Sequence, residues 1–334
     1  MKKLSRNTVR ATLWTVCAIA LPVCMNQAQA ASSYPDRPIT IVVGYPAGGS
    51  VDLNGRVVAE TLAKKIGANV VVENLGGAGG TIGAQKVIRA KPDGYTLLVG
   101  SLNEVVIASL VNPAVKYNGQ TDLQPIGLIG DQPLVLAASK LTDIKQASDL
   151  VKVAKAGKSA EYSYGSSGVG TSLHMAGEMV NAELPAKFMH VPYRGVSPLV
   201  TDLTSGRLAL GVFALSSALP QIESGQINAI GVTSAKRSFL AKDIAALAET
   251  PALKAIDISV WFGLFGPKGM PADVVNKLQT SLGQVLADPE FQKKYRMTGS
   301  NVILEQPDIA AFLAAEHDKF KKLAQTAHIA VEKP

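Results

Sequence analysis

The chain has 334 residues, of which 47% are hydrophobic and 18% charged, and its formal net charge is +7. Four basic residues and no acidic residue fall within the first 30 positions, which leaves 29 basic against 26 acidic residues, about +3, in the remainder. This near balance, with no basic patch interleaved with aromatic residues, argues against a nucleic-acid partner. The remaining 304 residues are long enough for two domains.

Residues 1–30 have the pattern of a cleaved secretory signal. A basic start precedes the apolar run Ala11–Met25, and Ala28-Gln29-Ala30 is a small-x-small cleavage site. A membrane anchor is the alternative, but the apolar run is shorter than the ~20 residues that a span needs. Cys17 and Cys24 both lie in this segment, so we expect a mature chain with neither disulfide nor thiol chemistry.

Short apolar runs then alternate with helical patterns along the chain. This alternation predicts an α/β fold with a mostly parallel sheet that helices cover on both faces. The expected strands are Ile39–Val43, Val70–Glu73, Tyr95–Val99, Pro125–Ile129, Glu161–Tyr164, Phe188–Val191, Leu208–Phe213, Ala229–Val232 and Val260–Phe265. Helical patterns are expected before Gly67, at Thr81–Arg89, Leu173–Ala182 and Pro198–Ser205, and in three segments after Val274.

Three loops rich in glycine and hydroxyl groups each follow an expected strand and lead into a helix. They are YPAGGSVDLNGR (Tyr45–Arg56), ENLGGAGGTIGA (Glu73–Ala84) and YGSSGVGTSLH (Tyr164–His174). Backbone N–H groups at a helix start favour an anion, and such loops can hold a carboxylate without lysine or arginine. Tight turns are the alternative explanation for the glycines. Three such loops at matching positions favour a shared cleft.

Enzyme motifs are incomplete in these loops. A dinucleotide-binding pattern starting at Gly77 would need glycine where Ile82 stands, and no P-loop lysine follows the glycines. A nucleophile elbow centred on Ser167 would need glycine where Val169 stands. Ser167 with His174 remains a possible nucleophile pair, although a serine at a helix start more commonly caps the helix.

Two further chemical possibilities are weak. The four histidines show no metal-ligand spacing, so we expect no metal and no cofactor. Asp52 could act as a general base, but at the start of a helix it is more commonly a cap or a first-turn charge.

An ordered set of segments closely resembles the Bug family, the periplasmic solute receptors of tripartite tricarboxylate transporters. The segments are YPDRPITIVVGYPAGGSVD, VVENLGGAGGTIGA, KPDGYTLLVGS, YSYGSSGVGTSLHMAGE, HVPYRG, SALPQIESGQINAIGVTSAKRS and VWFGLFGPKGMP. The resemblance implies a two-domain Venus-flytrap fold of the periplasmic binding protein type II class. Domain 1 would be discontinuous, at 31–131 and 258–334, domain 2 would cover 132–257, and crossovers would lie near Gly130–Leu134 and Ile256–Trp261.

The resemblance also implies a function. The expected protein is a monomeric, non-enzymatic periplasmic receptor that captures a small carboxylate and delivers it to the membrane subunits of a transporter. Two other functions stay open. The closed form could instead dock on a sensor kinase, or the protein could be a periplasmic carboxylate-ester hydrolase with Ser167 as nucleophile.

The ligand-binding residues that the resemblance implies come from both domains. From domain 1 they are Tyr45, Ala47, Gly48, Gly49, Ser50, Asp52, Ser101 and Asn103, with Gly79 and Gly80 of the second loop. From domain 2 they are Ser166, Ser167, Gly168, Thr171, His174 and Arg194. Arg194 stands where the family commonly has lysine, and it could pair with a distal carboxylate or remain a solvated loop charge.

One position departs from the family. Phe213 and Ala214 occupy the places of an Asp-Asn pair that the family usually carries near the ligand. A phenylalanine could pack against an apolar or aromatic ligand body, which would favour apolar carboxylates over amino acids. Alternatively, Phe213 faces the core of domain 2.

Overall fold

The computed structural model describes residues 34–193 and 196–329, all within one compact unit. The predicted signal peptide and Arg194 lie outside these residues. Within the described ranges, no helix combines the length and the apolar character needed to cross a membrane.

Ten strands and eleven α-helices are assigned in the described residues. The strands are β1 (Ile39–Val43), β2 (Val70–Asn74), β3 (Thr96–Ser101), β4 (Leu123–Ser139), β5 (Ser163–Ser166), β6 (Met189–Pro192), β7 (Leu210–Ala214), β8 (Ile227–Val232), β9 (Ser259–Pro267) and β10 (Asn301–Val302). The helices are α1 (Ser50–Ile66), α2 (Thr81–Ile88), α3 (Ala108–Val111), α4 (Gly119–Asp122), α5 (Ala147–Lys155), α6 (Ser172–Glu183), α7 (Val196–Thr204), α8 (Leu215–Glu223), α9 (Ala272–Leu286), α10 (Pro289–Met297) and α11 (Ile309–Thr326).

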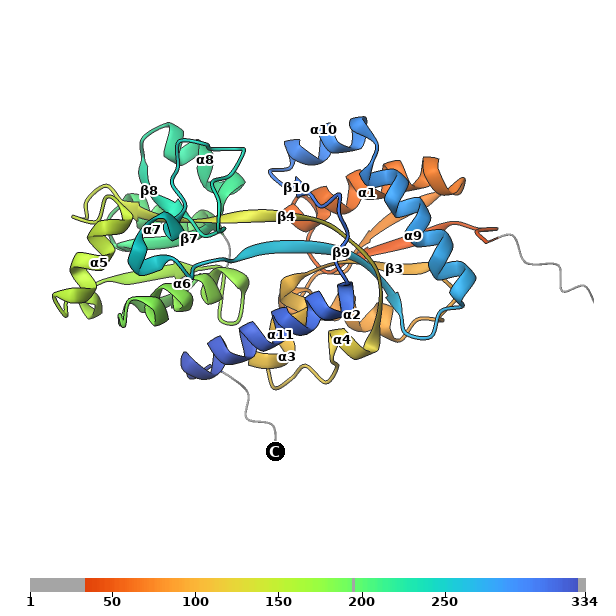
Figure 1. Cartoon of the computed structure of the whole chain (residues 1–334), viewed down its shortest axis with the longest axis horizontal. Helices are drawn as coiled ribbons and strands as arrows, with labels where there is room; N and C mark the ends of the chain where they lie inside the picture. The colour runs from red at the N-terminus through yellow and green to blue at the C-terminus, as the bar shows by residue number, and fades with distance from the viewer. Residues whose placement is uncertain (1–33, 194–195, 330–334) are drawn as a thin grey trace, which may run out of the picture. The chain divides into compact units, whose positions relative to one another are not determined.

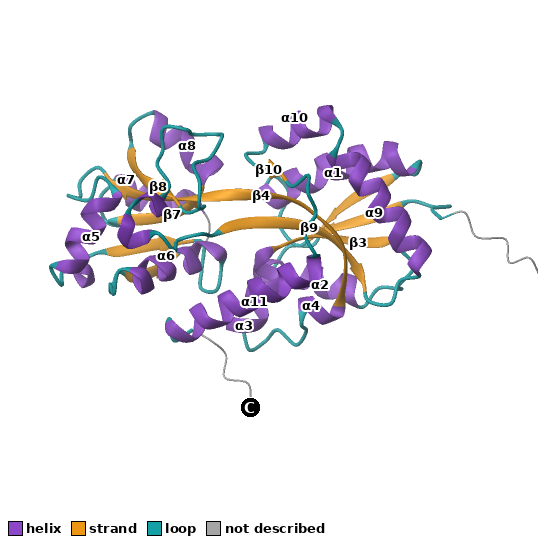
Figure 2. Ribbon diagram, viewed as in Figure 1, coloured by secondary structure: helices purple, strands orange, loops and turns teal. Residues whose placement is uncertain are grey.

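The strands form one continuous ladder in two parts, which share β4 (Figure 1). In the first part, β1 pairs in parallel with β2 and β3, and β9 runs antiparallel between β3 and β4. In the second part, β5 pairs in parallel with β6 and β7, while β4 pairs antiparallel with β7 and β8. In Figure 2, α1 and α10 lie on one side of β4 and β9, and α2 and α11 lie on the other.

The long strand β4 changes partners in its middle. Pro133 is paired with Ser259 of β9, and the next residue, Leu134, is paired with Ala214 of β7. The family resemblance implied a crossover between two domains near this point, and that division into domains stays a prediction. The prediction of a mostly parallel sheet was wrong for this region, because the connecting strands β4 and β9 run antiparallel to each other along nine residue pairs.

The apolar faces of the strands fill the core. The fully buried side chains include Ile39 and Ile41 of β1, Leu97 of β3 and Phe262 of β9. A smaller cluster lies against β7 in the second part of the sheet, where Phe213 packs with other buried apolar side chains. Burial of such side chains contributes about 1.5–3 kcal/mol each, so the core holds the strand ends that carry the loops.

Candidate functional site

A cleft of about 640 Å³ lies where the two parts of the sheet meet. The first and third glycine loops both contribute to its lining. The described residues that line it are Tyr45, Pro46, Ala47, Gly48, Gly49, Ser50, Val51, Leu53, Asn103, Gln132, Ser167, Ser172, Leu173, Val196, Ala214, Ser216, Ser217, Val260, Met297 and Thr298. None of these residues is charged.

The starts of α1, α6 and α8 lie at this cleft, as does Val196, the first residue of α7, and the starts of α1 and α8 have no side-chain cap. The residue before α1 is Gly49 and the residue before α8 is Ala214, and neither helix start receives a capping bond from a side chain. The first N–H groups of a helix have no partner within the helix, and a cap or an anion usually satisfies them. The starts of α1 and α8 therefore offer N–H donors to a ligand.

The third helix start, that of α6, differs because it is capped. Thr171 Oγ1 accepts a bond from His174 N at 3.3 Å. Ser172 follows the cap, is fully buried and lines the cleft. Its hydroxyl has no hydrogen-bond partner among the described residues. Because an unpaired buried hydroxyl is costly, Ser172 Oγ is a candidate ligand contact.

The rest of the lining is largely apolar. Val260 of β9 and Leu173 of α6 line the cleft, and exposed apolar side chains line it as well, namely Leu53, 43% exposed, and Met297, 80% exposed. Exposed apolar side chains gathered at a concave surface are typical of a site that binds an apolar body.

Asp52 supports the first loop and is absent from the lining of the cleft. Its carboxylate accepts bonds from Gly48 N at 2.8 Å, Arg56 Nε at 3.0 Å and Asn74 Nδ2 at 2.8 Å. Burial alone would raise the pKa of Asp52, but these bonds together lower it below its usual value. Gly48 has φ +86°, which favours glycine, so Asp52 holds a turn that presents the N–H groups of the loop.

A second buried acid lies beneath the same loop. Glu104, in the π-helical turn η2 (Asn103–Ile107), is fully buried. Its carboxyl group contacts Ser101 N at 2.7 Å, Ser101 Oγ at 2.5 Å and Tyr45 Oη at 2.8 Å. Burial raises the pKa of Glu104 to about 7. Single π-helical turns occur frequently at functional sites.

A buried histidine pair supports the third loop. The rings of His174 and His190 stack with centroids 3.8 Å apart. His174 Nδ1 accepts a bond from Gly170 N at 3.0 Å, and His190 Nε2 bonds Ser166 Oγ at 2.7 Å. Burial lowers the pKa of each histidine to about 4, so both rings are neutral near pH 7.

Two polar links join the sides of the cleft. Asn103 Oδ1 accepts a bond from Ser172 N at 2.9 Å, so η2 contacts the start of α6. Gln132 of β4 donates to Ser216 Oγ at 2.9 Å and to the Thr298 carbonyl at 3.2 Å. Residues far apart in the sequence are thereby held together at the cleft.

The structure brings together seven of the predicted site residues in the lining, namely Tyr45, Ala47, Gly48, Gly49, Ser50, Asn103 and Ser167. Nine others lie outside it: Asp52, Gly79, Gly80, Ser101, Ser166, Gly168, Thr171, His174 and Phe213. The second glycine loop therefore does not line the cleft with the other two, although the sequence predicted that it would. Ser101 and Ser166 are fully buried, and they bond to Glu104 and His190 respectively. Thr171 caps α6, and its hydroxyl donates to the carbonyl of Gly168 at 2.9 Å.

The ligand-facing interpretation of Phe213 is not supported. Its side chain is fully buried in the small core cluster, and its neighbour Ala214 lines the cleft instead. Successive residues of a strand point to opposite faces, so only one residue of this pair can face the ligand. Phe213 therefore follows the other possibility that the sequence left open.

Several lining residues were not predicted. Ser216 and Ser217 lie in the first turn of α8 directly after β7, but this segment has none of the glycines that identified the first loop. Gln132, Val260, Met297 and Thr298 carry no such local signal, because only the pairing of distant strands and helices brings them to the cleft.

The described residues supply no base to Ser167. The ring nitrogens of His174 face Gly170 and Glu178, with Nε2 3.7 Å from Glu178 Oε1, and His190 bonds Ser166. Nucleophilic catalysis needs a base within hydrogen-bond reach of the hydroxyl. No group of three potential metal ligands occurs in the described part of the chain.

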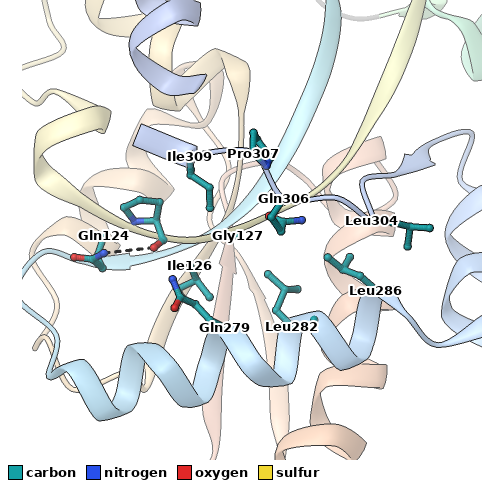
Figure 3. Close-up of a pocket in the computed structure, with 12 residues that line it drawn as sticks. Gln124, Ile126, Gly127, Gln279, Leu282, Leu286, Leu304, Gln306, Pro307 and Ile309 are labelled. Carbon is teal, nitrogen blue, oxygen red and sulfur yellow. Dashed lines mark hydrogen bonds between the residues drawn. The ribbon is translucent and has the colours of Figure 1, made fainter. Parts of the chain in front are cut away.

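A second hollow, of about 440 Å³, lies between α9 and the segment after β10 (Figure 3). Two of its three glutamine side chains already have hydrogen-bond partners. The Gln306 amide accepts a bond from Leu128 N and donates to the Leu128 carbonyl, and Gln124 bonds to the carbonyl of Pro125. No helix start opens into this hollow without a cap, so the first cleft remains the better candidate site.

The comparisons with known proteins agree with one another. The model of the tripartite tricarboxylate transporter family receptor matches residues 55–329. The UPF0065 protein in the tcbD-tcbE intergenic region of Pseudomonas sp. strain P51 is 33% identical over 307 residues, which cover 92% of this chain and 91% of that protein.

Two solved structures extend the similarity to the fold. Periplasmic binding protein BugD is 32% identical with a TM-score of 0.75, and the match covers 90% of this chain and all of that one. R. palustris Rpa4515, solved with adipate, is 30% identical with a TM-score of 0.78, covering 89% of this chain and 99% of that one. The fold is therefore that of the periplasmic binding proteins.

Proposed function

Because the chain belongs to the tripartite tricarboxylate transporter receptor family, we propose that it captures a small carboxylate in the cleft and presents it to the membrane subunits of such a transporter. The observation that carries this proposal is the pair of uncapped helix starts, α1 and α8, at an uncharged cleft. N–H donors at helix starts suit a carboxylate, and donors satisfied by a ligand need no side-chain cap.

The lining favours an acid with an apolar body. Two helix starts can each receive a carboxylate, while Leu53, Val260 and Met297 offer contacts to the segment between them. Adipate, which is bound in the R. palustris relative, has this arrangement of two carboxylates on an apolar chain. We therefore propose adipate-like or benzoate-like acids as ligands, ahead of hydroxy acids and acidic amino acids.

We also propose a cellular location and an oligomeric state for the protein. We propose secretion to the periplasm through residues 1–30, and domains that meet at the change of partners in β4. The protein would act as a monomer and without catalytic turnover, since Ser167 lacks a base among the described residues. A receptor that signals to a sensor kinase would bind ligands in the same way, and loss of transport or of gene induction would separate the two roles.

Titration calorimetry of the mature protein against adipate, benzoate, malate and glutamate tests the proposal. We expect tighter binding of adipate and benzoate, with each acid recovered unchanged. Leu53→Asp should weaken the binding of all four acids, because it replaces an apolar contact with a negative charge beside a cleft for an anion.

A matched control is Leu304→Asp, which alters an exposed leucine at the second hollow and should leave binding unchanged. Failure of all four acids to bind, or equal effects of the two substitutions, would contradict the proposed site.

A further inference from the structure

Glu104 is a buried acid beside an anion-binding cleft, and ligand capture as described above does not account for it. Its carboxyl group is enclosed by Tyr45, which lines the cleft, and by Ser101. A negative charge at this place would oppose a carboxylate in the cleft, and a buried charge without a cation is costly. The arrangement therefore raises the question of where the proton is.

The number of hydrogens available to the contacts around Glu104 indicates where the proton is. Three close oxygen contacts meet at Tyr45 and Glu104. Tyr45 Oη lies 2.9 Å from the Gly79 carbonyl and 2.8 Å from Glu104 Oε2, and Ser101 Oγ lies 2.5 Å from Glu104 Oε2. Tyrosine and serine each supply one hydrogen, so an ionised Glu104 leaves one contact without a hydrogen. A protonated Glu104 supplies the third.

The three contacts hold two glycine loops together. With Glu104 donating to Tyr45 Oη, the tyrosine donates to Gly79, which belongs to the second glycine loop. The backbone of this loop packs closely against Gly44, which follows β1, because a Cβ added at Gly44 would lie 2.5 Å from the carbonyl oxygen of Gly80. Tyr45 Oη also accepts a bond from Asn103 Nδ2 at 3.3 Å. The other end of that amide accepts from Ser172 N, so the network reaches the start of α6.

We propose that Glu104 is a positioning residue that must keep its proton for the cleft to bind a carboxylate, so that capture of the ligand is coupled to retention of one proton. This inference rests on the proposed function. Loss of the proton places a negative charge beneath Tyr45 and removes one hydrogen from the network. Both effects weaken the binding of an anion.

Among the described residues, no cation contacts the Glu104 carboxyl group. The titratable groups at η2 are Tyr45 and Tyr117, and Tyr117 bonds to the Glu104 backbone carbonyl. Helices α2, α3, α4 and α11, strand β3 and the turn Ala78–Gly80 also pack against η2. Asp122 of α4 accepts bonds from Asn118 N and Thr121 Oγ1. The lysines of α2 and α11 that form ion pairs bind acids other than Glu104: Lys86 pairs with Glu73, and Lys319 pairs with Glu316. The pKa of Glu104 is raised to about 7, first by burial, so the proton is lost near neutral pH.

Adipate titrations of the wild type and of Glu104→Gln, at about pH 6 and about pH 8.5, test the coupling. For the wild type we expect a constant Kd below the pKa of about 7 and up to about a tenfold rise per pH unit above it. Calorimetry in buffers of different ionisation enthalpy should show uptake of about one proton at the higher pH. Glu104→Gln, whose amide imitates the neutral acid, should show neither effect and bind as the wild type does at low pH.

Asp131→Asn is the matched control, because burial also raises the pKa of Asp131, a β4 residue outside the cleft lining. It should keep the wild-type profile. A flat profile in the wild type, or the same rise in Glu104→Gln, overturns the proposal.

Infrared spectroscopy of the ligand-free protein gives a second measurement that needs no ligand, and Asp131→Asn removes the band of the other carboxyl group whose pKa burial raises. A protonated carboxyl band should be present at about pH 6 and vanish through the pKa of about 7. Absence of the band overturns the proposal, even if Glu104→Gln fails to fold. Presence of the band with no binding of any acid contradicts the proposed function and the coupling, while leaving the proton on Glu104 in place.

Discussion

The two sides of the cleft are supported by buried titratable groups of opposite kinds. Beneath the first loop lies an acid, Glu104, whose pKa burial raises to about 7. Beneath the third loop lie His174 and His190, whose pKa values burial lowers to about 4. Glu104, His174 and His190 are thus all uncharged between these limits. The comparison shows that one physical cause, burial, keeps these three groups neutral beside a site for an anion. Glu104 becomes charged when the pH rises, whereas the two histidines become charged when the pH falls.

The largest expected effect is on the pH dependence of stability. The raised pKa of Glu104 contributes stability that is complete below 4.5 and is lost as pH rises through about 7. The lowered pKa of His174 acts in the opposite sense, since its contribution is complete above 6.5 and is lost as pH falls through about 4. Each contribution is on the order of 3 kcal/mol.

Denaturant unfolding between about pH 4 and about pH 7 should therefore distinguish the contribution of Glu104 from that of His174. Relative to the wild type, Glu104→Gln should gain stability as the pH rises. His174→Asn keeps an acceptor near Gly170 N, and it should lose stability relative to the wild type as the pH rises. If the unfolding free energy of both variants followed the same pH dependence as that of the wild type, Glu104 and His174 would not titrate as their burial implies.

A smaller effect should distinguish the bonds that hold the two loops. Asp52→Asn removes a charged acceptor that holds Gly48 N, and bonds to charged groups are worth about 1.5–3 kcal/mol. Ser166→Ala removes a neutral bond to His190, worth about 0.5–1.5 kcal/mol. We expect Asp52→Asn to weaken adipate binding more, as measured by calorimetry. An equal or reversed order would show that the first loop does not depend on its charged support.

The smallest expected effect separates two adjacent residues of the third loop. Ser172→Ala removes a buried hydroxyl that has no partner among the described residues, so binding should weaken by about 0.5–1.5 kcal/mol while stability stays constant or rises. Thr171→Ala removes a helix cap and should lower stability by about 1 kcal/mol. Thermal unfolding and adipate titration of both variants check this. Lower stability in Ser172→Ala with unchanged binding would make that hydroxyl structural.

The sequence predicted those parts of the molecule that depend on local chemistry. Apolar strands followed by glycine and serine at a helix start identified the loops at Tyr45–Ser50 and Ser166–Thr171 correctly as strand-to-helix connections. The strand β4 was predicted only at Pro125–Ile129, because Gly130 and Pro133 interrupt the apolar pattern. Its full length depends on pairing with β9, β7 and β8, which no local pattern reveals.

The supports of the site were the least predictable feature. His174 was expected to touch the ligand, but it lies beneath the loop, because stacking on His190 requires two segments that meet only in the fold. Glu104 lies in a short apolar segment, where a single acid is normally taken to face solvent. Only the folded chain shows that it is buried.

The uncharged lining of the cleft also has a kinetic consequence. A lysine or arginine in a binding site attracts anions over about a Debye length, roughly 8–10 Å, and this attraction weakens as salt increases. The N–H groups at the starts of α1 and α8 are dipolar, and their influence falls off within the first turn of the helix. The described lining therefore acts on an acid only once it has arrived. Capture by it depends on the frequency of encounter and on fit, and depends little on the ionic strength of the surroundings.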